Sequence, residues 1–358
     1  LAQAAIKLKI KTLVLDPTPS CPASLVSEQL LGDYKKTLPI KKIASKCDFL
    51  TFEIEGNNAS ALELVENEGK KVNPGPESLR VIQDKLIQKQ FLLSNDLPTT
   101  EFTQVKNKKE IKKVARYLGY PLVLNSRFHG FDVRGNALIK NEPQIYTALK
   151  KLKNSLLYVE KFVPFKRELA IQVAKSTNGI VKVYPLVKTI QKNNICHIVI
   201  FPSGVNKKIE DLATKSAKKC ISLLSGAGVF AVEMFETNEG KILINEIAPR
   251  VHNSGHWTIE GCRTSQFENH IRAVCGMSIK STKPKVKSAV MINILGNRNG
   301  KANIKGLKKI SGLKNTHLHL YNKKETRKER KMGHITVTGN NRYDVLKKAK
   351  LARSIISI

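Results

Sequence analysis

The sequence lacks several features that would assign it at once to a class of protein. No run of eighteen apolar residues occurs, which argues against a transmembrane helix. The six cysteines form neither a C-x-x-C pair nor a zinc-like spacing, so we expect buried free thiols in a reducing, cytoplasmic compartment. A Walker A sequence and a G-x-G-x-x-G sequence are both missing, which removes two common phosphate-binding motifs.

Acidic and aromatic residues are also scarce. There are 29 aspartates and glutamates against 62 lysines and arginines, giving a net charge of +33, and aromatic residues make up 6%. Such a charge can indicate a nucleic-acid or membrane partner. However, the lysines are spread along the chain in twos and threes, without a long basic tail. We therefore expect anionic small-molecule ligands, and neither a nucleic-acid nor a membrane partner.

The first half of the chain has an alternating α/β pattern. Residues 11–16 and 47–55 are predicted to be strands, residues 59–66 a helix, and residues 79–91 a helix that follows two prolines. Because the chain begins at Leu1 with a helix pattern that leads into a strand, we expect an N-terminal strand to be missing. Helices at 111–118 and 145–152 and strands at 121–125 and 156–163 predict a small α/β subdomain.

The second half is richer in strands. Strand-like runs fill residues 168–201, a helix is predicted at 209–224, and residues 229–235 and 242–247 form a predicted hairpin. After residue 280 the pattern is mainly β. The fold class is predicted to be α/β (α+β), with domains at 1–95, 96–165, 166–280 and 281–358.

Two acids lie inside the apolar strands of this hairpin, Glu233 and Glu246. A buried carboxylate needs a cation or a basic side chain nearby. With the adjacent Asn245, the two acids form an oxygen-rich set that suits Mg²⁺. An ordinary salt bridge is the alternative, and the acids share a sheet face only if the hairpin register allows it.

Three further segments could bind ligands. Directly after the hairpin, residues 245–261 gather Arg250, His252, Asn253, Ser254 and His256 at a strand end, where α/β proteins bind ligands. Residues 124–139 form a glycine- and arginine-containing loop that could close over phosphates, or an ordinary flexible hairpin. Residues 158–169 could form a hinge for adenine, or a strand followed by a turn.

Together these segments resemble the ATP-grasp superfamily, and within it the carboxyaminoimidazole ribonucleotide synthases. The resemblance is carried by LDPTPSCPAS, IQDK, RGNALIK, YVEKFVPF, VEMF, NEIAPRVHNSGHWTIEG and RKMGHI. It implies an N-terminal parallel-sheet domain, a small lid subdomain, a central mixed-sheet domain and a small β-rich C-terminal domain. The family's fungal relatives carry the same unit within a larger carboxylase.

The resemblance also implies roles for individual residues. ATP would be bound by Lys85, Asn125, Glu160, Lys161, Val163 and Glu168, and Mg²⁺ (or Mn²⁺) by Glu233, Glu246 and Asn245. Aminoimidazole ribonucleotide would be bound by Glu55, Asn253, Ser254, Lys323 and Arg330, with Arg250, His252, Asp132 and Arg134 as catalytic residues. The implied activity is an ADP-forming ligase of purine biosynthesis, active as a homodimer, which carboxylates the ribonucleotide with bicarbonate through carboxyphosphate.

Some positions depart from the family pattern. Asn125 replaces a phosphate-binding lysine, Phe131 a tyrosine and Val133 a glycine, while Lys188 and Gln191 replace an acid and a histidine. These changes leave two alternatives open: a catalytically impaired nucleotide-binding protein, or another ATP-grasp ligase acting on a related ribonucleotide.

Overall fold

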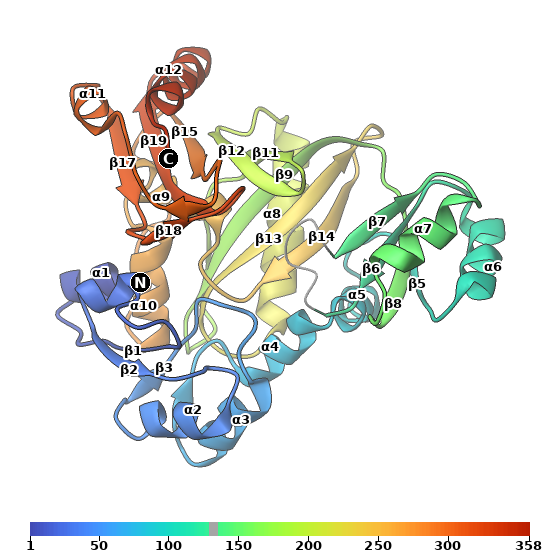
Figure 1. Cartoon of the computed structure of the whole chain (residues 1–358), viewed down its shortest axis with the longest axis horizontal. Helices are drawn as coiled ribbons and strands as arrows, with labels where there is room; N and C mark the ends of the chain where they lie inside the picture. The colour runs from blue at the N-terminus through green and yellow to red at the C-terminus, as the bar shows by residue number, and fades with distance from the viewer. Residues whose placement is uncertain (129–134) are drawn as a thin grey trace.

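A long sheet forms the centre of the molecule (Figure 1). Its neighbouring strands all pair in the antiparallel sense, so the mixed sheet expected for the central domain is in fact antiparallel. The computed structural model describes residues 1–128 and 135–358. Within them, the sheet has the strand order β14-β13-β9-β11-β12-β15-β19-β17, and β10 pairs with β9. No helix in these ranges is long and apolar enough to span a membrane.

The N-terminal part has short parallel strand pairs covered by helices. β1 (Leu13–Asp16) pairs with β2 (Glu28–Leu31), and β3 (Phe49–Leu50) with β4 (Lys71–Val72). The strand predicted at 47–55 is shorter than expected, because its partner β4 is followed by Asn73 and Pro74, and proline has no N–H for the ladder. The helices here are α1 (Ala2–Lys7), η1 (Pro22–Leu25), α2 (Thr37–Ala44) and α3 (Ala59–Asn67).

The single helix predicted at 79–91 is in fact two helices. α4 (Pro76–Gln83) and α5 (Lys85–Ser94) are separated by Asp84, whose backbone is extended and whose carboxylate accepts hydrogen bonds from Leu86 and Ile87. An aspartate in this position satisfies N–H groups that the first helical turn leaves unpaired. The break places Lys85 at the first position of α5.

A small α/β unit stands beside the central sheet, at the right of Figure 1. Its strands have the order β5-β8-β6-β7, and its helices pack on them around a separate hydrophobic core. The elements are β5 (Phe102–Val105), α6 (Lys108–Leu118), β6 (Leu122–Ser126), β7 (Asn136–Ile139), α7 (Gln144–Lys151) and β8 (Leu157–Lys161). Gly119, with φ +74°, caps the end of α6.

The long strands of the central sheet pack on helix α8 (Lys207–Leu223), whose buried face includes Ala213, Ala217 and Ile221. The strands are β9 (Phe165–Lys175), β10 (Val181–Val183), β11 (Val187–Lys192), β12 (Ile195–Phe201), β13 (Gly228–Thr237) and β14 (Ile242–Ala248). Gly226 lies beyond the end of α8. With φ +78°, it lets the chain approach the backbone of Gly75 more closely than a Cβ would permit.

The C-terminal segment extends the central sheet, because β15 (Ser288–Leu295) pairs with β12, and β19 (Lys331–Gly339) with β15. The other elements are η2 (Asn253–Gly255), α9 (Thr258–Gly261), α10 (Gln266–Val274), β16 (Gly300–Lys301), α11 (Leu307–Ser311), β17 (Thr316–Leu320), β18 (Glu325–Thr326) and α12 (Arg342–Ile355). The predicted domain boundaries remain predictions.

Candidate active site

Glu233 and Glu246 lie directly opposite each other on the antiparallel strands β13 and β14. The register shifts beside them, so that Asn245 is an extra residue in β14. This bulge turns Glu246 away from the core face on which Ile244 and Ile247 pack. Burial, together with the charge of Glu246 and then of Glu168, raises the pKa of Glu233 to about 7. Such a pair of carboxylates would be stabilised by a cation.

Lys85 provides a positive charge next to this pair. Its Nζ lies 3.1 Å from Oε2 of Glu246, and both side chains are largely buried. Burial by itself would lower the pKa of Lys85, but the neighbouring Glu246, followed by Glu160 and Glu233, raises it above the ordinary value. The helix break at Asp84 therefore places a cation where the sequence predicted a phosphate-binding lysine.

Glu160, at the end of β8, has a dense set of buried partners. Its carboxylate pairs with Lys89 at 2.9 Å and accepts hydrogen bonds from Thr100 and, at 3.0 Å, from Asn125. The amide of Asn125 thus contacts an acid in the predicted adenine hinge. Lys89, whose side chain is 3% exposed, is a residue that the sequence analysis missed. Its position in the apolar stripe of α5 was the available signal.

The other predicted nucleotide-binding residues surround this hinge. Lys161 is exposed and pairs with Glu101 at 3.2 Å, and Val163 lies in the connection between β8 and β9. Glu168 lies on β9, where burial raises its pKa to about 7, although a main-chain hydrogen bond from Gln191 acts in the opposite direction. Since the charge of Glu168 also acts on Glu233, the hinge and the acid pair border one region.

The loop after β14 is held by buried hydrogen bonds. Nη2 of Arg250 lies 2.7 Å from Oε1 of Glu55, so the loop is joined to the N-terminal part. Asn253 exchanges side-chain hydrogen bonds of 3.0 and 2.6 Å with Asn293 of β15. Gln172 donates to the hydroxyl of Ser254 at 2.8 Å. The sequence analysis missed Gln172 and Asn293, because each lies on a strand remote in sequence from the loop.

His252 occupies the centre of this loop. Its Nδ1 lies 2.8 Å from the hydroxyl of Ser254, and Gln266 bonds both its main-chain N–H and its carbonyl. Burial is the main cause that holds the pKa of His252 well below its ordinary value, and the positive charges of Arg250 and Lys331 lower it further. The imidazole is therefore neutral at physiological pH and can donate or accept one hydrogen bond without bringing a charge.

Basic side chains gather at the C-terminal side of the same region. Lys323 donates to the carbonyl of Lys331 at 2.9 Å, and Arg330 donates to the carbonyl of Glu325 at 2.7 Å. Burial, with the neighbouring charges of Arg330, Lys331 and Arg327, lowers the pKa of Lys323 to about 8. A bound anion would reduce the repulsion among these positive charges. Lys331, which the sequence analysis missed although it follows Arg330 directly, acts electrostatically on both His252 and Glu233.

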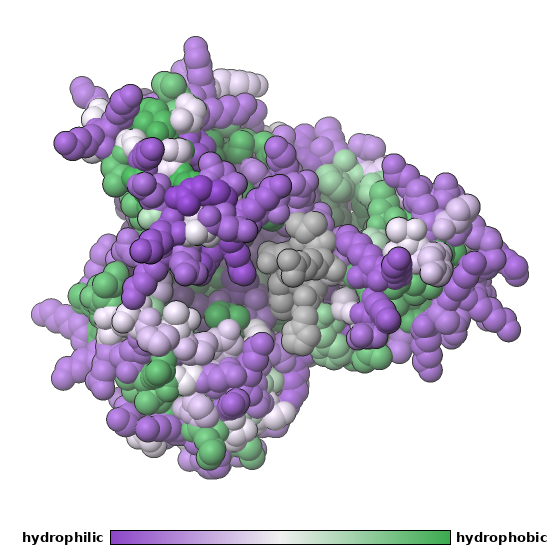
Figure 2. Space-filling view, viewed as in Figure 1, coloured by the Kyte–Doolittle hydropathy of each residue, from purple (hydrophilic) through white to green (hydrophobic). Residues whose placement is uncertain are grey.

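The space-filling view shows the N-terminal and C-terminal parts meeting around a hollow whose rim is mainly hydrophilic (Figure 2). The structure thus brings most of the predicted residues together around one region. The predicted residues Asp132 and Arg134, and the departures Phe131 and Val133, lie outside the described residues. Among the described residues, no group of three or more histidine, cysteine, aspartate or glutamate side chains is arranged to bind a metal ion.

Models of three protein families match most of the chain. Residues 1–83 match the ribonucleotide synthetase preATP-grasp domain, residues 90–267 the ATP-grasp domain, and residues 289–348 the phosphoribosylaminoimidazole carboxylase C-terminal domain. The fold and the site therefore define a member of the ATP-grasp superfamily.

Individual relatives narrow the assignment. Phosphoribosylaminoimidazole carboxylase of Schizosaccharomyces pombe is 40% identical over 95% of this chain, which spans 63% of that protein and so less than two thirds of its length. N5-carboxyaminoimidazole ribonucleotide synthase of Staphylococcus aureus is 35% identical, with 95% of this chain and 90% of the relative covered. The chain belongs to the N5-carboxyaminoimidazole ribonucleotide synthase family.

Solved structures show the same similarity in three dimensions. The synthase from Aspergillus clavatus, complexed with ATP, has a TM-score of 0.91 and 35% identity, covering 99% of this chain and 94% of that one. The Thermotoga maritima synthetase has a TM-score of 0.91, 38% identity and the same coverage. The predicted superfamily, family and fold are thereby confirmed.

Proposed function

We propose that the chain is an ADP-forming ligase that uses ATP and bicarbonate to convert 5-aminoimidazole ribonucleotide to carboxyaminoimidazole ribonucleotide in purine biosynthesis. The observation that carries the proposal is the opposed pair Glu233 and Glu246, with Lys85 beside it and the Arg250 loop close by. An Aspergillus clavatus structure that is 34% identical was solved with ADP and 5-aminoimidazole ribonucleotide, which supports the choice of substrates.

In this proposal, ATP lies along the hinge at Glu160, Lys161 and Val163, with Glu168 toward the ribose and Lys85 at the phosphates. The raised pKa of Glu233 fits a bound cation, since positive charge would stabilise both ionised acids. Glu233, Glu246 and Asn245 would hold Mg²⁺, or Mn²⁺ in its place, which would neutralise phosphate charge during transfer.

The proposed reaction has two steps. A bicarbonate oxygen attacks the γ-phosphorus of ATP, and ADP leaves, giving carboxyphosphate. The exocyclic amine of the ribonucleotide then attacks the carboxyl carbon, or the CO₂ released from it; phosphate departs and the amine loses a proton. Arg250 and neutral His252 would contact the reacting groups, while Glu55, Asn253, Ser254, Lys323 and Arg330 position the ribonucleotide. Catalysis would come from positioning and from exclusion of water.

Phosphate release from ATP tests the proposal directly. We expect release to require bicarbonate and aminoimidazole ribonucleotide together, and to fall at least 100-fold (about 2.7 kcal/mol or more) in Glu246→Gln. Exposed Glu239, also paired with a lysine, provides a matched control, and Glu239→Gln should retain full activity. Release that is independent of the ribonucleotide would refute the assignment. Phosphate release measured with a panel of related ribonucleotides would show whether the chain is instead an ATP-grasp ligase with another substrate.

Asn125 favours a second candidate, a nucleotide-binding protein with weak or no turnover. The amide hydrogen-bonds Glu160 and brings no positive charge toward the phosphates. This alternative predicts tight ATP binding without phosphate release, together with a gain of turnover in Asn125→Lys. A wild-type chain that turns over at a rate unaffected by Asn125→Lys would exclude it.

We further propose that the protein is cytoplasmic and forms a homodimer, without nucleic-acid or membrane partners. Light scattering of the purified chain tests the dimer, and binding assays with DNA, RNA and anionic vesicles at low salt test the excluded partners.

A further inference from the structure

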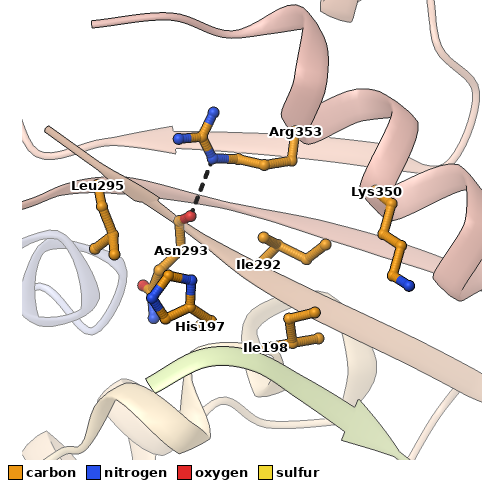
Figure 3. Close-up of a pocket in the computed structure, with 7 residues that line it drawn as sticks. All are labelled: His197, Ile198, Ile292, Asn293, Leu295, Lys350 and Arg353. Carbon is orange, nitrogen blue, oxygen red and sulfur yellow. Dashed lines mark hydrogen bonds between the residues drawn. The ribbon is translucent and has the colours of Figure 1, made fainter. Parts of the chain in front are cut away.

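A cavity of about 220 Å³ lies between β12, β15 and α12 (Figure 3). None of its lining residues is assigned to the proposed reaction, although Asn293 is hydrogen-bonded to Asn253. Three aliphatic side chains form part of its wall, and three basic residues, His197, Lys350 and Arg353, complete most of the rest. None of the residues that line it is acidic. The cavity is therefore both apolar and positively charged.

Arg353 is the central basic group. Its Nε donates to the carbonyl of Asn293 at 3.2 Å, as Figure 3 shows, and its Nη1 donates to the carbonyl of Ile356 at 2.7 Å. In the part of the chain that the structure describes, these two carbonyls are its hydrogen-bond acceptors, and it has no carboxylate partner. Burial lowers its pKa. A half-buried guanidinium with spare N–H groups and no counter-ion would be stabilised by an anion.

His197 comes to the cavity wall through an irregularity in β12. Cys196 pairs with Gln191 and Ile198 with Ile190, so His197 is an extra residue in the strand. Bulges of this kind change the direction of a side chain. Burial lowers the pKa of His197, and the charges of Lys192 and Arg353 lower it further. Its ring is thus a natural reporter of any anion that enters.

We propose that this cavity binds the phosphate group of a small ligand. Arg353 donates N–H bonds to the phosphate oxygens, Lys350 adds a flexible positive charge, and His197 donates from its ring. The volume of about 220 Å³ accommodates a phosphate group with a few carbon atoms. The aliphatic wall favours a phosphate monoester over inorganic phosphate.

Histidine-ring NMR of the whole chain tests this site independently of any activity. Inorganic phosphate and glycerol 3-phosphate are titrated separately, with glycerol as the uncharged control, and His197→Gln assigns the resonance. We expect the His197 signal to shift with saturation, and the pKa of His197 to rise. Stronger binding of glycerol 3-phosphate identifies a monoester as the ligand, whereas equal binding identifies inorganic phosphate.

Lys350→Ala should weaken the affinity that His197 reports by about three- to fivefold, the usual effect of one exposed charge. Lys218 is an exposed lysine on α8 and serves as the matched control, so Lys218→Ala should leave the titration unchanged. A His197 signal that does not respond to either phosphate, or that responds identically in both lysine variants, would overturn the proposal.

Discussion

Replacing Lys89 by methionine removes a buried positive charge while leaving a side chain of similar length. Lys89 donates to Glu160 and to the hydroxyls of Thr99 and Thr100, and the side chains of the ion pair are 3% and 11% exposed. Breaking a buried pair costs about 3–5 kcal/mol of folding free energy, because one charge is left without a partner. We expect a loss of this size in Lys89→Met.

The pKa of Glu160 shows why the effect should be large. Burial raises this pKa, yet Lys89 and Thr100 together hold it below its ordinary value. Without Lys89, the pKa of Glu160 should rise, because burial then has less positive charge acting against it. The double variant Lys89→Met/Glu160→Gln should therefore recover most of the lost stability, since replacing both members of a buried pair is often close to neutral.

Urea unfolding of the four proteins in this cycle measures the effect. The exposed pair between Lys161 and Glu101 provides the control, and Lys161→Met should cost no more than about 1 kcal/mol. If Lys89→Met proves no more destabilising than Lys161→Met, or if the double variant loses the sum of both single losses, the reasoning about a buried pair is wrong.

Three further predictions concern charge. Because the pKa of Glu233 is about 7, Mn²⁺ affinity measured by EPR should fall as pH drops below 7, and Glu233→Gln should remove this dependence. Burial lowers the pKa of His270 to about 3. Since the unfolded chain binds a proton there below about pH 6.5, the folded state should lose roughly 2 kcal/mol of stability between about pH 6.5 and 5. Acid unfolding of His270→Gln should lack this contribution. Lys323→Met should raise the KM for the ribonucleotide roughly tenfold or more and leave that for ATP unchanged; equal changes in both would contradict a phosphate role.

The sequence predicts elements best where they are regular. The hairpin of β13 and β14, the capped helix α6 and the apolar face of α8 follow directly from residue patterns. The helix break at Asp84 was not predicted, since an aspartate inside an amphipathic pattern can equally be a surface residue. Its role depends on the two N–H groups that it caps.

Individual contacts in the candidate site were harder to predict from the sequence. The two acids could be identified, but their shared face depends on the bulge at Asn245, which residue patterns do not reveal. The sequence places Lys89 within a predicted helix. Its pairing becomes visible only in the structure, where Glu160, remote in sequence, lies 2.9 Å from it. The position of Lys89 in the apolar stripe of α5 marks it as unusual, but a local pattern cannot reveal its partner, because the pairing is tertiary.

The central sheet itself explains how charges from distant strands come to act on one site. Five pairings separate β13 from β19, which would place them about 24 Å apart in a flat sheet. Nevertheless, Lys331 at the start of β19 acts electrostatically on Glu233 of β13 and on His252. Curvature of the sheet, which strong twist produces, would account for this proximity. The acid pair and Lys331 thus belong to one continuous hydrogen-bonded sheet, which would fix the proposed nucleotide site and the proposed site of the ribonucleotide phosphate relative to each other.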